Sequence, residues 1–322
     1  MQISIVIQSW NFADYLHEAI ASALALSAPA ADEIIVIDDA SSDASAQIAK
    51  GFDDPRLRVI VNAHNLGAAQ TFNRAFAQSC GEFVARLDGD DRYRPDFLTH
   101  AMAAFARHPE AVAVYGRIEM IDRAGRASQP ERHPALPCGV HCGDRFLDLM
   151  ADNFLSAPTL IARRQAWQRA LPLPADMAFF DWYAALRIAE SGPLAFTDAV
   201  HADYRVHAAG MHNEMIRQGW GETIYFRVLD QLFSEPSRAA EKALRRGQIK
   251  AAWYRRLGDS YFGTDQLGAA RRCYVRALLA APRHPGWPTS SRRLLATWLP
   301  PAVYVRAKRL ARLANVGSAA DR

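Results

Sequence analysis

The sequence predicts an α/β fold in which a mostly parallel β-sheet is flanked by helices and is followed by an all-helical C-terminal region. Three short, mainly apolar runs carry this prediction, at residues 3–7, 34–37 and 82–87. Continuous apolar runs of this length are typical of parallel strands that are buried on both faces. Segments of helix length separate the runs, which indicates repeated strand–helix–strand units. From about Met215 onward the apolar spacing is helical throughout.

The helices between the runs are predicted from apolar spacing and from capping residues. Residues 13–25 place Leu16 and Ile20 on one helix face. A run rich in serine at 41–45 is a capping region for a second helix over 44–51. The remaining elements expected are a strand at 58–61, helices at 67–79 and from after Pro95 to 108, a strand at 111–115, an irregular loop at 124–143, a strand at 153–162, a helix from Asp181, and strands at 194–196 and 202–206.

The charges divide the chain into two parts. Residues 1–214 carry 18 Lys and Arg against 27 Asp and Glu, a net charge of −9, whereas residues 215–322 carry 20 against 7, a net charge of +13. We therefore expect an α/β domain over 1–214 and a basic helical region over 215–322. Nucleic acid is not expected as a partner, because the acidic first part would oppose its binding.

Three features predict a cytoplasmic protein. The four cysteines are scattered, so no disulfide framework is expected and a reducing compartment is favoured. The chain starts with a strand rather than with a basic leader. Its longest late apolar stretch, residues 294–305, is too short to span a membrane.

An acidic cluster, Asp-Gly-Asp-Asp at residues 88–91, follows the third apolar run. Carboxylates this close repel one another unless a cation lies among them, and oxygen ligands favour Mg²⁺ or Mn²⁺ over zinc. The other two runs also end in polar residues, at 8–11 and 38–39. Because ligands of parallel sheets lie outside the carboxyl ends of the strands, the three polar ends should share one crevice.

The order of these motifs resembles that of family 2 glycosyltransferases of the GT-A fold type, whose sheet is Rossmann-like. The segments that carry the resemblance are 4–11, 33–43, 65–67 with Asn73, 81–83, 87–91, 95–96 and 204–207. The chain departs from the family at residues 8–11, where Gln-Ser-Trp-Asn replaces the usual Pro-Thr-Tyr-Asn. It also has Phe72 where an arginine is common, and Phe180 where a second acid usually precedes the late helix.

The resemblance implies an inverting glycosyltransferase of the hexosyltransferase type, which moves a sugar from a nucleotide-diphosphate donor to an acceptor hydroxyl. It implies that residues 1–96 bind the nucleotide and that residues 97–214 bind the acceptor, a glycan or a lipid-linked molecule. It also implies a role in bacterial cell-surface polysaccharide or glycolipid synthesis.

The resemblance further implies roles for the acidic residues. Asp90 is expected to be the direct ligand of Mg²⁺ or Mn²⁺, and Asp88 to contact the metal or the ribose. Asp91 either supports the metal site from behind or is a turn residue. Asp181 is expected to accept the proton of the acceptor hydroxyl. The alternative for Asp181 is a plain helix N-cap.

The donor should be held by residues from several loops. Asp38 or Asp39 is expected to hydrogen-bond the base or the ribose. Trp10 is expected to stack on the base, and core packing is the alternative. The other donor-binding residues implied are Gln8, Asn65, Arg205 and His207. The last two could neutralise the diphosphate, and a surface ion pair is their alternative role.

Two features of the basic region suggest contacts with other molecules. Residues 251–284 have the spacing of one tetratricopeptide-like unit, which cannot bury its own face alone. A tail over 292–315 interleaves leucine and aromatic residues with arginine, which suits an anionic membrane surface. A helix packed on the protein body is the alternative for the tail. The membrane hypothesis places the protein on the inner face of the cytoplasmic membrane.

Two rival functions fit parts of the pattern. A scaffold that binds a sugar nucleotide without turnover is suggested by the acid missing at Phe180. A nucleotidyltransferase would share the fold type and the metal, but it normally needs a glycine-rich basic loop after the first strand. Residues 10–13 offer no such loop.

Overall fold

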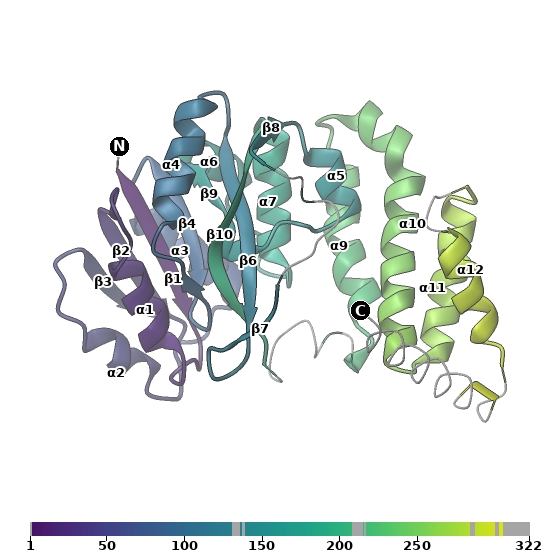
Figure 1. Cartoon of the computed structure of the whole chain (residues 1–322), viewed down its shortest axis with the longest axis horizontal. Coiled ribbons are helices and arrows are strands. Elements are labelled where there is room, and N and C mark those ends of the chain that lie inside the picture. The colour runs from purple at the N-terminus through teal and green to yellow at the C-terminus, as the bar shows by residue number, and fades with distance from the viewer. Residues whose placement is uncertain are drawn as a thin grey trace, which may run out of the picture. The chain divides into compact units, whose positions relative to one another are not determined.

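The computed structural model describes residues 2–130, 136, 139–207, 215, 217–283, 287–299 and 303–304. The chain forms two compact units, residues 1–210 and 211–322. Figure 1 shows the first unit from purple to teal and the second in green and yellow.

The first unit is built on a mixed sheet that has ten strands within the described residues, and this confirms the predicted fold class. The strand order is β3-β2-β1-β4-β9-β6-β10-β5, with β7 beside β6 and β8 beside β10. The strands are β1 (Ile3–Ser9), β2 (Glu33–Asp38), β3 (Leu57–Val61), β4 (Phe83–Asp88), β5 (Arg92–Tyr93), β6 (Ala113–Ile121), β7 (Ala127–Pro130), β8 (His141–Gly143), β9 (Ile161–Arg163) and β10 (Leu194–Arg205). The first four strands are parallel, as their apolar runs predicted.

Helices cover both faces of this sheet. Helices α1 (Leu16–Leu24) and α4 (Phe97–Arg107) lie on one face of the sheet (Figure 1), and they pack in one core with the odd-numbered side chains of β4. The even-numbered side chains of β4 point to the other face, which α3 (Ala68–Gln78), α6 (Arg164–Ala170) and α7 (Phe180–Ser191) cover. The remaining helical segments of this unit are α2 (Ser45–Lys50), α5 (Phe146–Ala151) and the 3₁₀ turn Ala157–Thr159.

Three local predictions are corrected by the structure. The strand predicted at 153–162 is wrong, because Ala157–Thr159 forms a 3₁₀ turn and only β9 pairs. Pro158 has no N–H to donate, which is consistent with a turn at that point. The loop predicted at 124–143 contains β7 and β8, and the two strands predicted at 194–206 are one strand, β10, with an irregular register around Val200. The conformation of these segments depends on pairing with strands distant in sequence, and local sequence patterns do not reveal such pairing.

The second unit is helical, as predicted. Its helices are α9 (Gly221–Ser234), α10 (Ala239–Gly263), α11 (Leu267–Ala280) and α12 (Trp287–Ala296). A Cβ at Gly258 would lie 2.7 Å from the ring of Tyr274, so glycine lets α10 and α11 approach closely. Tyr274 Oη donates to Asp259 Oδ1 at 2.7 Å. The helix pair of the predicted unit at 251–284 therefore exists, whereas its kinship with tetratricopeptide repeats stays a prediction.

The predicted tail, residues 292–315, lies partly outside the described residues. In the described part, the guanidinium carbon of Arg271 lies 3.8 Å from the ring centroid of Trp298, and Tyr304 Oη donates to Asp265 Oδ1 at 3.0 Å. Leu295 and Trp298 nevertheless remain mostly exposed. In the described ranges, none of the helices combines the length and the apolar character that crossing a membrane would require.

A buried histidine in the first unit makes its stability depend on pH. His201 is fully buried between β6 and the 3₁₀ turn, with its ring nitrogens 2.6 Å from Thr197 Oγ1 and 3.2 Å from the carbonyl oxygen of Thr159. A Cβ at Gly116 would lie 2.7 Å from the His201 ring, which shows how tightly the ring is packed. Burial lowers the pKa of His201 to about 4.

We predict that His201 destabilises the fold in acid. Because the pKa falls from 6.5 in the unfolded chain to about 4 in the folded one, the unfolded chain binds the proton first as the pH drops. Stability is full above pH 6.5 and is lost progressively toward pH 4, by about 2 kcal/mol at pH 5. Urea unfolding at pH 7.5 and pH 5 should show a smaller loss in a His201→Gln variant than in the wild type. An exposed control, His64→Gln, should leave the loss unchanged, and equal losses in all three proteins would contradict the prediction.

Candidate active site

The polar ends of three parallel strands lie side by side. In the register of the sheet, Ser9 is opposite Asp38, and Gln8 is opposite Asp88. The loops after β1, β2 and β4 therefore leave the sheet at one edge, as the sequence predicted.

The carboxylates after β2 are turned into the protein. Asp38 is fully buried and accepts hydrogen bonds from the backbone N–H and the hydroxyl of Ser41, at 2.9 and 2.6 Å. Asp39 is also buried and accepts three hydrogen bonds, from Asn62 Nδ2 at 2.7 Å and from the backbone N–H groups of Leu66 and Gly67 at 2.8 and 2.9 Å. Both side chains thus build the loops of the site, and any contact between them and a nucleotide stays a prediction.

The loop after β1 presents an aromatic ring to solvent. Trp10 is 53% exposed, so its predicted alternative role in the core is wrong. The next residue, Asn11, has a φ of 58° and is held by the loop after β2, because its Oδ1 accepts from the backbone N–H of Ser42 at 2.8 Å. Asn65 closes the neighbouring loop through Oδ1, which accepts from the backbone N–H of Gly67 at 3.1 Å. Trp10 is therefore a free ring on a loop with a fixed backbone.

Helix α3 ties this side of the sheet to the segment that precedes Asp181. Asn73 Nδ2 donates to the carbonyl of Leu173 at 2.9 Å, and Asn73 Oδ1 accepts from the N–H of Leu173 at 2.9 Å. Gln70 Nε2 donates to the same carbonyl at 3.0 Å. A single amide thus satisfies both backbone groups of Leu173.

The acidic cluster separates into inward and outward side chains. A Cβ at Gly89 would lie 2.9 Å from the carbonyl oxygen of Gln8, so only glycine fits there. Asp91 is buried and accepts from the backbone N–H of Arg205 at 2.8 Å. Burial, together with the nearby charges of Asp90 and Asp88, raises the pKa of Asp91 well above its usual range. Asp91 is therefore placed to stabilise the loop from inside.

The charge of Asp181 acts on the carboxyl group of Asp88. The Asp88 side chain is 30% exposed and forms an ion pair with Arg86. Burial raises the pKa of Asp88 to about 6, Arg86 opposes this rise, and the charges of Asp90 and Asp181 add to it. Asp181 of α7 also lines a small hollow together with Arg86, the ion-pair partner of Asp88.

This donor set suits a hard divalent cation. Asp90 Oδ2 lies 3.0 Å from His207 Nε2, and both side chains are mostly buried, so the two atoms can reach one ion. Asp88, at the end of the neighbouring strand β4, is engaged by Arg86. Carboxylate oxygens with one imidazole nitrogen suit Mn²⁺ and are compatible with Mg²⁺. Burial is the main cause of the raised pKa of Asp88 and the charges of Asp90 and Asp181 add to it, so a bound cation would favour the ionised form.

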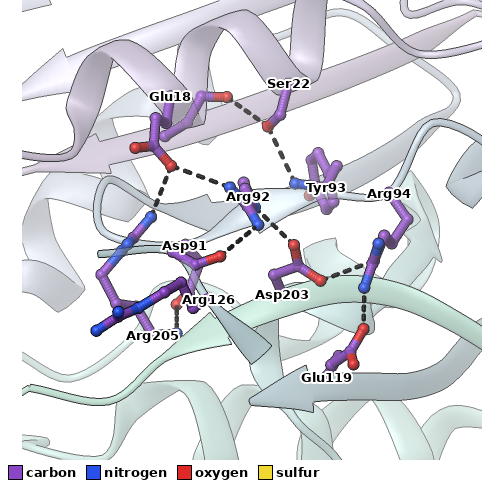
Figure 2. Close-up of polar contacts among 12 residues, drawn as sticks. Glu18, Ser22, Asp91, Arg92, Tyr93, Arg94, Glu119, Arg126, Asp203 and Arg205 are labelled. Carbon is purple, nitrogen blue, oxygen red and sulfur yellow. Dashed lines mark hydrogen bonds and ion pairs between the residues drawn. The ribbon is translucent and has the colours of Figure 1, made fainter. Parts of the chain in front are cut away.

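Arg205 has a fully buried side chain, and it forms an ion pair with Glu18, whose side chain is 46% exposed. A contact of Arg205 with a diphosphate stays a prediction. Its Nε donates to the carbonyl of Asp90 at 2.8 Å and its Nη2 to Glu18 Oε2 at 2.8 Å, while Nη1 donates to the carbonyls of Asp122 and Arg123. Figure 2 shows Glu18 between Arg205 and Arg92. All three nitrogens are occupied, and Arg205 holds the loop of the acidic cluster in place.

Asp181 is not a helix cap. It is the second residue of α7, and the N-cap position belongs to Phe179, whose side chain makes no capping bond. Among the described residues, no group donates a hydrogen bond to the Asp181 carboxylate. This half-buried residue lines a small hollow together with Arg86.

Two residues of the site were missed by the sequence analysis. Arg86 lies two positions before Asp88 on β4 and shares its face of the sheet. The signal was an arginine inside an otherwise apolar run. Tyr204 belongs to a motif that was noticed but had no role assigned. Burial raises the pKa of its hydroxyl far above the usual range, and the charges of Asp91, Asp88, Asp90 and Asp181 add to this effect.

Comparison with known proteins gives the relatives of the chain. The profile described as "Glycosyl transferase family 2" matches residues 4–166. An uncharacterised protein of Mycobacterium tuberculosis is 30% identical over 214 residues, which cover 65% of this chain and 60% of that protein. The Escherichia coli protein WfgD, described as a UDP-Glc:alpha-D-GlcNAc-diphosphoundecaprenol beta-1,3-glucosyltransferase, is 28% identical over 159 residues, covering 48% and 62%. The matches thus span only about 60% of the length of these curated relatives.

A solved structure shows the same fold. The mannosyltransferase PcManGT from Pyrobaculum calidifontis, solved in complex with GDP-Man and Mn²⁺, superposes with a TM-score of 0.59. The match covers 97% of this chain and 87% of that chain at 18% sequence identity. At this identity the likeness establishes the fold.

We predict that alanine substitutions at Asp39 and at Trp10 have different effects on the free energy of unfolding. Asp39→Ala removes the acceptor of three hydrogen bonds in a buried loop and should lower the free energy of unfolding by about 2–4 kcal/mol. Trp10→Ala removes an exposed ring and should change it by less than about 0.5 kcal/mol. Urea unfolding of both variants provides the check. Equal destabilisation by the two changes would show that one of the two assignments is wrong.

Proposed function

Because the chain belongs to glycosyl transferase family 2, we propose that it transfers a sugar from a nucleotide-diphosphate donor to an acceptor hydroxyl with inversion at the reacting carbon. One observation carries the proposal: Asp88 lies at the carboxyl end of β4, and its partner Arg86 shares a small hollow with Asp181. An inverting displacement needs a carboxylate on the acceptor side and a place for the diphosphate on the other.

The base of this reaction is Asp181. It accepts the proton of the attacking hydroxyl as the new bond forms. Its position in the first turn of α7 supports this role, because the helix dipole stabilises an anionic side chain there. Its carboxylate is also free of hydrogen bonds from the described residues, so it can accept one from a ligand.

The leaving diphosphate is held at the acidic cluster. Asp90 and Asp88 are the metal ligands in this proposal, and His207 supplies a nitrogen beside Asp90. A Mg²⁺ or Mn²⁺ ion bound there would offset the negative charge that grows on the diphosphate oxygens. The Mn²⁺ present in the complex of the archaeal mannosyltransferase is consistent with this donor set.

The nucleoside lies over the loops after β1 and β2. Trp10 stacks on the base, since its ring is exposed while its backbone is held. Gln8, Asp38, Asp39 and Asn65 shape the loops beneath the nucleotide. Arg205 keeps the acidic cluster in register and does not contact the donor in this proposal.

The acceptor is a glycan or a lipid-linked molecule in bacterial surface polysaccharide or glycolipid synthesis. The name of the relative WfgD includes a diphosphoundecaprenol acceptor. Such an acceptor lies at a membrane, and the basic second unit suits the anionic inner face of the cytoplasmic membrane. Leu295 and Trp298 are apolar groups exposed on that unit.

We predict that an Asp181→Asn variant keeps donor binding and loses turnover. Loss of the base should reduce the rate of nucleoside diphosphate release by about 10²–10⁴-fold with Mn²⁺ and a panel of UDP-glucose, UDP-N-acetylglucosamine and GDP-mannose. Binding of the nucleoside diphosphate should change less than about twofold, because Asp181 is assigned no contact with it. The matched control is Asp148→Asn, which alters an exposed acid in the first turn of α5.

The outcomes also separate the rival functions. A wild type that binds nucleotide sugar and never releases nucleoside diphosphate would be a silent scaffold. Release of pyrophosphate from a nucleoside triphosphate would indicate a nucleotidyltransferase.

We predict that the full chain binds vesicles that contain anionic lipid. Co-sedimentation with phosphatidylglycerol vesicles should exceed that with phosphatidylcholine vesicles and should fall as salt is raised, because the attraction is electrostatic. A variant that combines Leu295→Ser with Trp298→Ser should bind phosphatidylglycerol vesicles more weakly than the wild type does. Equal sedimentation with both lipids would contradict the membrane hypothesis and would leave the transferase proposal intact.

A further inference from the structure

One nitrogen of a buried guanidinium has no partner among the described residues. Arg86 is only 6% exposed, and its Nη1 is buried without a hydrogen bond. The other two nitrogens are engaged: Nε donates to Gln8 Oε1 at 2.6 Å, and Nη2 pairs with Asp88. A buried charged donor without an acceptor costs more than a neutral one, so a ligand oxygen at Nη1 would be a stabilising addition.

The guanidinium cannot turn away to find another partner. Gln8 is itself held, because its Nε2 donates to the carbonyl of Ala68 at 2.7 Å. This bond aims Gln8 Oε1 at Arg86 and fixes the side of the guanidinium that carries Nε. The ring centroid of Phe180 lies 4.6 Å from the guanidinium carbon and covers its face. An aromatic ring over the face cannot accept the in-plane N–H of Nη1.

Arg86 opens into a small hollow that also contains the proposed base. Its walls include Arg86, Asp181, Phe180, Trp167, Leu155 and Leu160. Its volume of about 10 Å³ is about that of one water-sized group. A small polar group of a ligand, such as a hydroxyl, therefore fits this hollow beside Asp181.

We propose that Arg86 Nη1 donates a hydrogen bond to one hydroxyl oxygen of the donor sugar, so that Arg86 helps to select the sugar. The inference rests on the proposed function, because Asp181 acts beside the sugar carbon that is attacked. The diphosphate is assigned to Asp90 and His207, so it is not the partner of Arg86. A carboxylate is disfavoured, because Asp88 already balances the charge of Arg86 and Asp181 adds a second negative charge.

The test compares the nucleoside diphosphate with its sugar conjugates. Binding of UDP, UDP-glucose, UDP-N-acetylglucosamine, GDP and GDP-mannose is measured by calorimetry with Mn²⁺ on the full chain. Arg86→Lys keeps a positive charge beside Asp88 and removes Nη1. We expect affinity for the nucleoside diphosphate to change less than about twofold, while the gain in affinity from the preferred sugar falls about tenfold.

A matched control is available at the other end of β4. Arg164 also lies over an aromatic ring, Phe76 at 4.8 Å, and donates to the carbonyl of Gly81. Arg164→Lys should leave both affinities unchanged. If Arg86→Lys does not fold, monodeoxy analogues of the preferred nucleotide sugar on the wild type give the same information, because a single missing hydroxyl should account for the tenfold loss.

The results distinguish this inference from the proposed function. A wild type that binds neither nucleoside diphosphates nor nucleotide sugars would remove the proposed function itself. Equal losses for diphosphate and sugar in Arg86→Lys would overturn the inference alone, since Arg86 would then act through Asp88. A wild type that binds the diphosphates and gains nothing from any sugar would overturn it as well.

Discussion

Electrostatic repulsion among carboxylates at one edge of the sheet is the constraint on which the rest of the first unit depends. The parallel strands β1, β2 and β4 end together, and the loops that follow β2 and β4 bring five aspartates to that edge, to which α7 adds Asp181. The protein compensates some of these charges with its own donors. Asp88 meets Arg86 and Asp90 meets His207, and a cation bound beside them would add further compensation.

Two neighbouring aspartates of the acidic cluster have different environments. Asp91 is turned inward and receives the backbone N–H of Arg205, whereas Asp90 is turned outward and meets His207. Arg205 joins both, because its backbone binds one and its side chain binds the carbonyl of the other. The buried arginine therefore sets the direction of the acidic cluster.

The sequence was sufficient for the elements that are buried on both faces. The runs of β1, β2 and β4 are continuous and apolar, so their ends and the shared edge could be predicted from local patterns. The 3₁₀ turn at Ala157–Thr159 and the strand β8 could not, because their conformation depends on partners far away in the chain. Gln8, Asp38 and Asp88, at the ends of these strands, likewise lie at one edge, which follows from strand register.

What the sequence could not show is the direction of each side chain. Asp38, Asp39 and Arg205 have the residue types of a binding site, yet their polar atoms are occupied by the protein. Trp10 could equally have filled the core, and only the three-dimensional structure shows it exposed. Arg86 was overlooked because its partner Gln8 is 78 residues away in sequence.

The amide of Asn73 has a consequence for how such domains evolve. It binds both backbone groups of Leu173, so α3 supports the segment that leads to Asp181. A recombination that joined the N-terminal half of one relative to the C-terminal half of another would break these bonds unless both ends came from the same parent. Such domains should therefore diversify by point changes within the later half more readily than by exchange of whole halves.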